Sequence, residues 1–448
     1  MVSAKRRTVD TKRFHHLTGQ LFTDQYYHIY NARLNCAREA LITRSRFRWG
    51  DEVKHLPLEQ LNASLGTTDV FVIGTLFKLM PRQPSILREL ETSEPLVKDQ
   101  DVNFTSDEDS LVLHETDENV QVVGEIDVHL HVTGIPVSLL GHQLNGGAKF
   151  HVVDVCYAGP NLSVYRMPKE NEYEDLEPGK QRLLIVSGLE FGFDSHLSKV
   201  QSEEVIDAFK KLRDLLVGQC STKDSNKSQD FEVVKLIIAG NSIAPGYTKS
   251  KSELLGSSQT KSDKSLNEVF QMFDRYLFSL AQSGLEIDVM PGKNDPTSFL
   301  LPQQPFHPRI LPRSGLLTNV HPNTNPCIIQ QDGYLILGTS GENVEAIRQY
   351  TRIEYSTTAL KNTLEWGHIA PSAPDNLSCV PFRDKDPFII DFVPDIYFAG
   401  NQPEYANTTY STETKTKIQI VSVPSFVKTM AGVLVNLSNL ECELMSFR

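Results

Sequence analysis

Polar residues follow three predicted buried strands of this chain, at the point where each strand ends. In open α/β sheets, ligands and metals collect at this carboxyl edge. Two metal ions held there would polarise a phosphoryl group and generate hydroxide, so the residue types at the edge decide whether hydrolysis is possible. The polar residues are Ser187 after the first strand, Asn241 after the second, and Lys293, Asn294 and Asp295 after the third.

These strand ends carry few groups that bind divalent metals. Such ions favour anionic oxygen or imidazole nitrogen, whereas Asn241 and Asn294 are neutral amides and Lys293 is a cation. Asp295 is the single carboxylate of the set, and one carboxylate cannot hold two metals. We therefore expect no metal pair, no cofactor and no catalytic residue. We expect Asp295 to anchor its turn by accepting hydrogen bonds from backbone N–H groups.

Other histidines of the chain could mimic a metal site. Asp127, His129 and His131 alternate with apolar residues, which predicts the solvated face of a barrel strand. A second Asp-x-His string, Asp194 to His196, lies several residues past a strand end, and we interpret it as a surface loop. We interpret His321 as a structural loop residue, since no partner for catalysis lies near it in the sequence.

Composition restricts the classes of function. The 448 residues are 40% hydrophobic and 22% charged, which is typical of a globular protein of two domains. The net charge of -12 disfavours autonomous binding to a phosphate backbone. No apolar run is long enough to span a bilayer, and we expect no secretory signal. The six cysteines are scattered without a Cys-x-x-Cys pair, as expected for reduced thiols.

The chain divides into four segments by pattern. Residues 1–47 are predicted to form a helical arm, and 166–182 an acidic linker. Residues 48–165 contain several short apolar strands with glycine turns, which predicts a five-stranded OB-type barrel. OB barrels often bind single strands through aromatic side chains over a basic groove. The few aromatics and acidic flanks of this barrel favour protein docking instead.

Residues 183–448 alternate strands and helices before returning to strands. Ser202 and Ser265 are the expected N-caps of two amphipathic helices between the first strands. Three late strands begin near residues 395, 417 and 432. The fold class is therefore α/β plus all-β, with a barrel followed by a two-sheet sandwich flanked by helices.

The order of the strand ends resembles the calcineurin-like phosphoesterase family, which implies an αββα sandwich. That family places Asp-x-His, Gly-Asp, Gly-Asn-His-Asp/Glu and Gly-His-x-His at four successive positions. Here the turn glycines remain, whereas Asp295 alone keeps a residue type of the family. The resemblance thus implies a domain whose metal ligands are lost. Its vestigial positions are Ser187, Leu189, Asn241, Lys293, Asn294, Asp295, Asn401 and Pro403.

A degenerate domain after an OB-type barrel resembles the B-subunit family of replicative DNA polymerases. Segments similar to that family are residues 338–344, 324–326, 369–375 and 386–401. Length and the absence of a further N-terminal domain make the chain look like the polymerase delta branch.

The resemblance implies a nuclear, non-catalytic scaffold for replication and repair synthesis. In the delta branch such a scaffold binds the cysteine-rich C-terminal module of the catalytic subunit and a third, elongated subunit, and it meets DNA only through the complex. The alternatives are a phosphoesterase with an unusual metal set and a single-stranded DNA-binding barrel. The interface residues cannot be assigned from the sequence.

Overall fold

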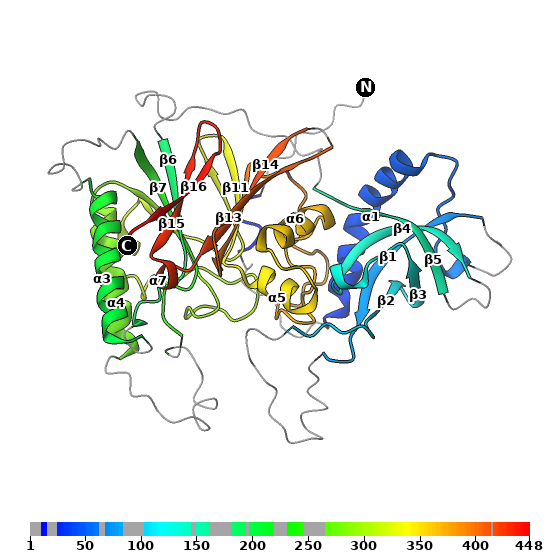
Figure 1. Cartoon of the computed structure of the whole chain (residues 1–448), viewed down its shortest axis with the longest axis horizontal. Coiled ribbons are helices and arrows are strands. Elements are labelled where there is room, and N and C mark those ends of the chain that lie inside the picture. The colour runs from blue at the N-terminus through cyan, green and yellow to red at the C-terminus, as the bar shows by residue number, and fades with distance from the viewer. Residues whose placement is uncertain are drawn as a thin grey trace, which may run out of the picture. The chain divides into compact units, whose positions relative to one another are not determined.

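The protein is described from a computed structural model in which two compact units are distinguished (Figure 1). Unit 1 consists of residues 1–9, 19–165 and 343–393, and unit 2 of 10–18, 166–342 and 394–448. None of the helices within the described residues is both long and apolar enough to cross a membrane. The structure describes residues 10–15, 25–61, 68–83, 103–144, 149–160, 181–193, 197–218, 231–245, 247, 265–413 and 415–448.

A closed five-stranded barrel forms the centre of unit 1, as the OB-type prediction requires (Figure 1). The strand order is β1-β2-β3-β5-β4, with β3 and β5 parallel and the other neighbours antiparallel. Alternate side chains point inward, so Leu111 and Leu113 of β2 are buried. The strands are β1 (Val70–Leu79), β2 (Ser110–Glu115), β3 (Glu118–Gly124), β4 (Ile135–Gln143) and β5 (Lys149–Tyr157).

Helix α1 (Tyr27–Trp49) packs on strands β1, β4 and β5 of the barrel. Its apolar residues Leu34 and Leu41 share a buried cluster with Phe71 and Ile73. The helix begins later than the predicted arm: residues 10–15 form turns, and residues 1–9 and 16–24 lie outside the described residues. The remaining helical elements of this unit are η1 (Leu58–Gln60), η3 (Val128–Leu130), α5 (Glu342–Tyr350, from Asn343 onward) and α6 (Ser356–Trp366).

Arg33 of α1 is fully buried and holds distant segments of unit 1 together. Its Nε atom lies 2.7 Å from Asp386 Oδ2, and its Nη1 donates to the carbonyls of Gly134 (2.9 Å) and Pro371 (2.7 Å). Asp386 also accepts from His368 Nε2 at 2.9 Å. A buried guanidinium is tolerated only when its donors are paired in this way. Arg33 therefore links α1, the barrel and the segment 371–386.

The buried imidazole of His368 makes unit 1 sensitive to acid. Its Nδ1 accepts from Ala370 N (3.2 Å) while its Nε2–H faces Asp386, which fits the neutral tautomer. Burial, then the positive charge of Arg33, lowers the pKa of His368 to about 4. Burial alone would raise the pKa of Asp386, but His368 and Arg33 hold it well below its usual range, so Asp386 stays ionised.

We expect the free energy of unfolding of unit 1 to fall as the pH decreases from about 6.5 to about 4. In this window the unfolded imidazole binds a proton that the folded one does not, so lowering the pH favours unfolding. His368→Asn should flatten the dependence, whatever its effect at pH 7. Urea titrations at pH 7 and pH 5, followed by tryptophan fluorescence, measure this because Trp49 and Trp366, the two tryptophans, both belong to unit 1. Equal pH dependence in both proteins would refute the assignment.

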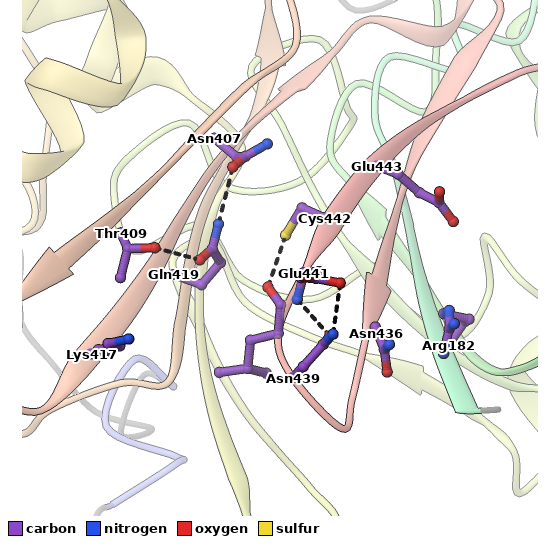
Figure 2. A pocket seen from close by; sticks show the side chains of 11 residues that line it. Arg182, Asn407, Thr409, Lys417, Gln419, Asn436, Asn439, Glu441, Cys442 and Glu443 are labelled. Atoms are coloured by element: carbon purple, nitrogen blue, oxygen red, sulfur yellow. Dashed lines mark hydrogen bonds between the residues drawn. The ribbon is translucent and has the colours of Figure 1, made fainter. Parts of the chain in front are cut away.

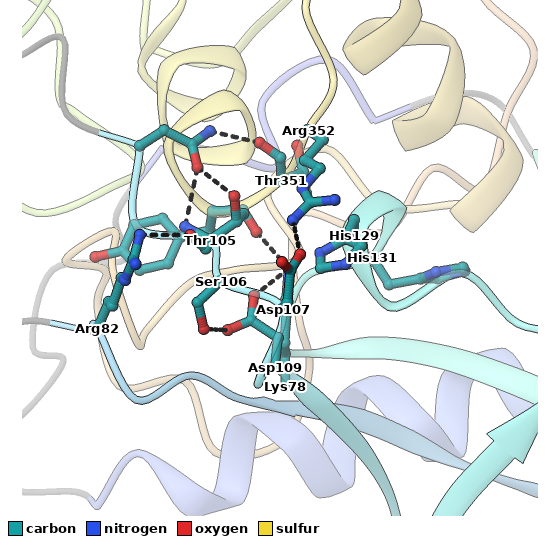
Figure 3. Close-up of polar contacts among 12 residues, drawn as sticks. Lys78, Arg82, Thr105, Ser106, Asp107, Asp109, His129, His131, Thr351 and Arg352 are labelled. Carbon is teal, nitrogen blue, oxygen red and sulfur yellow. Dashed lines mark hydrogen bonds and ion pairs between the residues drawn. The ribbon is translucent and has the colours of Figure 1, made fainter.

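Polar contacts also join Lys78 and residues 103–109 to the last turn of α5 and the residues after it, within unit 1 (Figure 3). Asn103 Nδ2 donates to the carbonyls of Arg348 (2.9 Å) and Thr351 (2.6 Å), and Arg352 pairs with Asp107. The buried Lys78 Nζ donates to Tyr350 O at 2.7 Å and lies 3.5 Å from Asp109. These contacts explain why residues 343–393 cluster with the barrel.

Two sheets stack in unit 2 to form the predicted sandwich. The six-stranded sheet has the order β16-β15-β6-β7-β8-β9, with β6 to β9 parallel, and the five-stranded sheet has the order β10-β11-β12-β14-β13. The strands are β6 (Gln181–Val186), β7 (Glu232–Ala239), β8 (Glu286–Met290), β9 (Val320–Pro322), β10 (Cys327–Gln331), β11 (Tyr334–Thr339), β12 (Ile396–Gln402), β13 (Ala406–Ser411), β14 (Lys417–Pro424), β15 (Ala431–Asn436) and β16 (Cys442–Ser446).

Apolar side chains fill both faces of the six-stranded sheet. On its outer face lie α3 (Lys199–Leu216) and α4 (Leu266–Ala281) (Figure 1). Their apolar stripes include the buried residues Val205, Leu212 and Phe273. A second cluster, which includes Ile237 and Phe398, fills the space between the two sheets. Short helices η5 (Ser314–Leu316) and α7 (Phe426–Thr429) complete the unit.

The helix starts test the predicted N-caps. Ser265 caps α4 as predicted, in a capping box with Glu268. The prediction of Ser202 for α3 is wrong, because the helix begins one turn earlier. Ser198 is its N-cap, in a capping box with Gln201, and Ser202 Oγ donates to Ser198 O at 3.0 Å.

The two units differ in extent from the segments predicted by sequence pattern. All of 183–448 was expected in one domain, whereas residues 343–393 make their contacts with the barrel unit and residues 10–15 with the sandwich unit. The contacts of Arg33, Lys78 and Asn103 are the physical reason for the first difference. The linker 166–180, the string Asp194 to His196 and the loop 248–264 lie outside the described residues.

Candidate functional site

Five of the predicted positions meet in one corner of unit 2. β6, β7 and β8 are parallel neighbours, so the residues after them lie at one edge of the sheet. The end of β12 in the second sheet reaches the same place. Asn401 N donates to Ser187 Oγ at 2.8 Å, and Asn294 N donates to Asn241 Oδ1 at 3.1 Å. We call Ser187, Asn241, Asn294, Asp295 and Asn401 the polar corner.

The other three predicted positions do not join the polar corner. Leu189 is 1% exposed and packs in the apolar cluster beneath α3 and α4. The resemblance to calcineurin-like phosphoesterases implies a histidine at this position, whereas the leucine found here is part of the apolar core. Pro403 and Lys293 are exposed, and solvent therefore screens the charge of Lys293.

Ser187 and Asn401 use most of their hydrogen-bonding groups within the protein. The Ser187 hydroxyl lies 3.0 Å from Pro424 O and 3.2 Å from Val423 O, and Asn401 Nδ2 donates to Ser340 O (2.8 Å) and Ala239 O (3.2 Å). Asn401 Oδ1 and the hydroxyls of Ser242 and Ser425 are buried and have no hydrogen-bond partner among the described residues. A metal ion would meet only neutral oxygens at those atoms.

Backbone conformation explains why asparagine and glycine shape these turns. Asn241 and Asn401 have φ of 52° and 56°, in the left-handed region that asparagine tolerates better than most residues. Gly240 has φ 81°, and a Cβ there would lie 2.4 Å from Ser340 Cβ. The turns therefore bring the strand ends close together, as a site at this edge would require. The side chains that the turns present there are the amides of Asn241 and Asn401.

Asp295 anchors its turn, as predicted. Its carboxylate is 5% exposed and accepts from the backbone N–H groups of Gly292 (2.8 Å), Ile243 (2.9 Å) and Ser242 (3.2 Å). Burial raises the pKa of Asp295 to about 7 against these three donors, which lower it, and Glu342 raises it further. Both oxygens thus accept from the backbone after two strand ends, which uses three of the roughly four acceptor sites of a carboxylate.

Asp295→Asn is expected to lower the free energy of unfolding of unit 2 by about 1–3 kcal/mol, because an amide offers one acceptor oxygen and faces backbone donors with its NH2 group. Urea unfolding followed by far-ultraviolet circular dichroism measures the change. Asp207→Asn is the control, since Asp207 is exposed on α3, and surface substitutions change stability by about 0.5 kcal/mol or less. Equal effects of the two variants would show that the three hydrogen bonds are dispensable.

A second polar network beside the corner was not predicted as part of a site. Asn325 Nδ2 donates to Gln303 Oε1 (2.7 Å), Ser340 Oγ (3.1 Å) and Glu342 Oε2 (3.1 Å), and Ser340 Oγ donates to the Glu342 carboxylate at 2.6 Å. The sequence marks residues 324–326 and 338–344 only as segments similar to a family. Nothing in their local spacing indicates that they meet.

The donor set does not fit a dinuclear metal centre. Among the described residues, no three or more His, Cys, Asp or Glu side chains lie together in a way that could hold an ion. Asp295 is bonded to backbone N–H groups, and Glu342 to Ser340 and Asn325. The remaining donors are amides and hydroxyls, which bind divalent ions weakly. The corner therefore supports no reaction step through a metal.

The histidines at positions 129, 131 and 321, which the structure describes, have partners within the fold. The prediction of a strand through Asp127 to His131 is wrong, because residues 128–130 form the 3-10 helix η3 and Asp127 Oδ1 accepts from His129 N (2.8 Å). His131 is buried with Nε2 at 2.6 Å from the Tyr157 hydroxyl, and burial lowers its pKa. His321 lies in β9, 2.6 Å from Glu286.

Comparison with known proteins gives matches for both units. Residues 183–407 match the B-subunit family of DNA polymerases alpha and epsilon, and residues 25–155 match the DNA polymerase delta subunit OB-fold domain. DNA polymerase delta subunit 2 of Drosophila melanogaster is 31% identical over 96% of this chain and 95% of its own. The DNA polymerase delta small subunit of Arabidopsis thaliana is 33% identical over 94% of this chain and 91% of its own. That of Saccharomyces cerevisiae is 28% identical over 94% of this chain and 89% of its own.

The OB barrel therefore matches the delta subunit OB-fold domain, and most of the two-sheet sandwich with its amide-rich corner matches the polymerase B-subunit family. The chain belongs to the alpha/epsilon B-subunit family of DNA polymerases. Within it, the matches over nearly the full length are to delta small subunits, which supports the delta branch over alpha and epsilon.

Proposed function

We propose that this chain is a non-catalytic scaffold of the DNA polymerase delta holoenzyme in the nucleus. In this role it joins the catalytic subunit, through that subunit's cysteine-rich C-terminal module, to a third, elongated subunit during replication and repair synthesis. It meets DNA only through the complex.

The observation that carries the proposal is that the side chains of the polar corner are used in hydrogen bonds within the protein. Its one carboxylate accepts three backbone N–H groups, and its amides bridge strand ends. These side chains stabilise a fold whose usual chemistry requires free acids and imidazoles at the same edge. A domain retained without that chemistry serves through its surface, and the relatives named as polymerase delta small subunits give the class of assembly.

Co-expression with the catalytic and third subunits of polymerase delta from the same organism tests the proposal. We expect one stoichiometric complex on size-exclusion chromatography, and a loss of the third subunit from the catalytic subunit when this chain is omitted. Association of those two subunits without this chain would overturn the linking role.

The isolated chain tests the absence of catalysis. Elemental analysis should find no stoichiometric manganese or zinc, and the chain should not hydrolyse a phosphodiester such as bis(p-nitrophenyl) phosphate. Two bound metal equivalents with turnover would make it an enzyme. Tight oligothymidine binding with a steep salt dependence would instead favour a single-strand binder.

A further inference from the structure

Two histidines face each other on the barrel of unit 1, and an aspartate lies beside one of them. His142 of β4 and His151 of β5 are direct partners in the antiparallel register, and their ring centroids lie 5.3 Å apart. The register of β1 with β4 places Asp69, directly before β1, opposite His142. The three residues therefore form one row across the neighbouring strands β1, β4 and β5.

This row points away from the interior of the barrel. His151 lies between two buried residues of β5, and successive side chains of a strand point to opposite faces. Asp69 shares the face of Phe71, which packs against helix α1 on the outside of the barrel. The side chain of His142 is 22% exposed and that of Asp69 is 46% exposed. Ions in solution can therefore reach the two imidazoles, although neither ring is a freely moving surface group.

Asp69 determines which nitrogen of His142 can bind a metal. His142 Nδ1 lies 2.9 Å from Asp69 Oδ1, so in the neutral ring Nδ1 carries the proton and donates it to the carboxylate. Nε2 then keeps the lone pair that a metal ligand requires. A carboxylate behind a ligating imidazole is the usual arrangement at zinc sites, where it fixes the ring and raises its basicity. Among the described residues, no hydrogen bond reaches His142 Nε2 or the ring of His151.

The neighbouring strand β3 gives the ring of His151 its place. Val123 of β3 pairs with His151 in the parallel register, and Gly124 follows it. A Cβ at position 124 would lie 3.0 Å from both Nδ1 and Cε1 of His151. The glycine therefore allows the imidazole to lie close against β3, which limits its movement beside His142.

The separation of the two rings suits one tetrahedral ion. Zinc binds imidazole nitrogen at about 2.0–2.1 Å, so two nitrogens on one ion lie about 3.3 Å apart and their ring centroids about 5 Å apart. The observed 5.3 Å is close to this value. Imidazole is a preferred donor for zinc, whereas magnesium and calcium favour oxygen donors. The chemistry of the pair therefore selects a transition-metal ion of the zinc type.

We propose that His142 and His151 bind one Zn²⁺ ion on the outer face of the barrel, with Asp69 as the residue that positions His142. Water completes the tetrahedron. Two side chains bind the ion, so this pair differs from a cluster of three or more ligands, which the described residues do not contain. Two ligands hold zinc less tightly than the three or four of catalytic and structural sites, so the ion is bound from added salt and is lost during purification. The inference goes beyond the proposed function and does not depend on it.

Titration of the purified full chain with zinc chloride, in competition with a chromophoric chelator, tests the site. We expect one saturable equivalent in the wild-type chain and its loss in His142→Asn and in His151→Asn. Asp69→Ala keeps both ligands and should weaken zinc binding by roughly tenfold or more. His321→Asn is the matched control, because His321 also lies beside a carboxylate, 2.6 Å from Glu286, and it should leave the affinity unchanged.

The stability of unit 1 gives the second readout. An ion that binds only the folded state raises the free energy of unfolding. Added zinc should therefore raise the urea midpoint of the tryptophan fluorescence, which reports on unit 1, in the wild-type chain but not in His151→Asn. Each protein is compared with itself without zinc, so a lower starting stability of the variant does not affect the result.

Three results would overturn the site and leave the proposed function intact. The first is a wild-type chain that binds no saturable equivalent of zinc. The second is a His151→Asn chain that binds zinc as tightly as the wild type. The third is a loss of binding in His321→Asn equal to that in His142→Asn, which would mean that zinc binds histidines of the chain without regard to the row on the barrel.

Discussion

Arg33→Met is expected to lower the free energy of unfolding of unit 1 by about 3–5 kcal/mol, the cost of removing one partner from a buried ion pair. The Asp386 carboxylate, itself buried, would lose its guanidinium. The carbonyls of Gly134, Pro371 and Ala373 would each lose a donor in a place that water does not reach. Methionine matches the length of the stem but supplies none of the four hydrogen bonds.

A double variant separates the two causes of this loss. In Arg33→Met with Asp386→Asn no uncompensated charge remains, so part of the stability should return relative to Arg33→Met. His368 Nε2 and Phe388 N still face residue 386 in that protein. Recovery therefore measures the penalty of the stranded carboxylate, and the unrecovered part measures the missing donors to the three carbonyls.

Arg48→Met on the same helix is the matched control. Arg48 binds Asp154 through two hydrogen bonds of 2.6 and 2.9 Å, but its side chain is 54% exposed. An exposed pair of this kind contributes about 1 kcal/mol or less. Urea unfolding monitored by tryptophan fluorescence reports on unit 1 for all three variants. If Arg33→Met lowered the free energy of unfolding no more than Arg48→Met does, the buried contacts of Arg33 would not be what holds the segments of unit 1 together.

Local pattern predicted the elements of the fold wherever burial follows a simple period. The apolar runs of β1 and β4 and the parallel strands β6, β7 and β8 were recognised, because strands buried on both faces are apolar throughout. β5 was recognised as well, although it is only partly buried. β2 was missed, since Ser110–Glu115 alternates apolar with polar residues directly after an acidic run. Its partners in the barrel, rather than its own composition, define it as a strand.

Long-range contacts account for the other differences. No local rule distinguishes Arg33 from the exposed arginines of α1, because its partners are more than 100 and more than 330 residues away. The same contacts draw residues 343–393 to the barrel unit. For α3, two serines four residues apart both fit an N-cap, and the choice depended on Gln201 completing the capping box with Ser198.

The polar corner was predictable because topology alone gathers it. Residues after parallel neighbouring strands meet at one edge, so Ser187, Asn241 and Asp295 could be grouped from the sequence alone. Glu342 and Asn325 come from connections whose path depends on the second sheet, and sequence spacing gives no such information. A cleft of unit 2 lined by Arg182, Gln419 and Glu441 is likewise formed by strands of both sheets and by the turn between β15 and β16 (Figure 2).

Phe273→Ala is expected to lower the free energy of unfolding of unit 2 by about 3–5 kcal/mol, the usual cost of truncating a buried phenylalanine. Phe273 is 0% exposed on the inner face of α4. Its ring lies 5.4 Å from that of Phe191 and 5.9 Å from that of Phe306, measured between centroids. The ring thus connects the helix to segments after β6 and after β8, both of which lead from the polar corner.

The position of Phe273 matters more than its residue type, and two controls test this. Phe270 lies one turn earlier and is only partly buried, so Phe270→Ala should cost less than Phe273→Ala. Phe299 is 81% exposed, so Phe299→Ala should change stability by about 0.5 kcal/mol or less. Far-ultraviolet circular dichroism in urea follows the unfolding, and hydrogen exchange of β7 and β8 assigns it to unit 2.

If burial determines the effect, the loss in free energy of unfolding is smallest for Phe299→Ala, larger for Phe270→Ala and largest for Phe273→Ala. The tryptophan fluorescence of unit 1 detects any change outside unit 2. A similar loss in all three would mean that residue type alone governs the effect and that α4 does not pack as described. The graded order would instead support the apolar layer between α4 and the six-stranded sheet. That layer holds β7 and β8 in the register that places Asn241 beside Asn294 and lets Asp295 reach the backbone of residues 242 and 243.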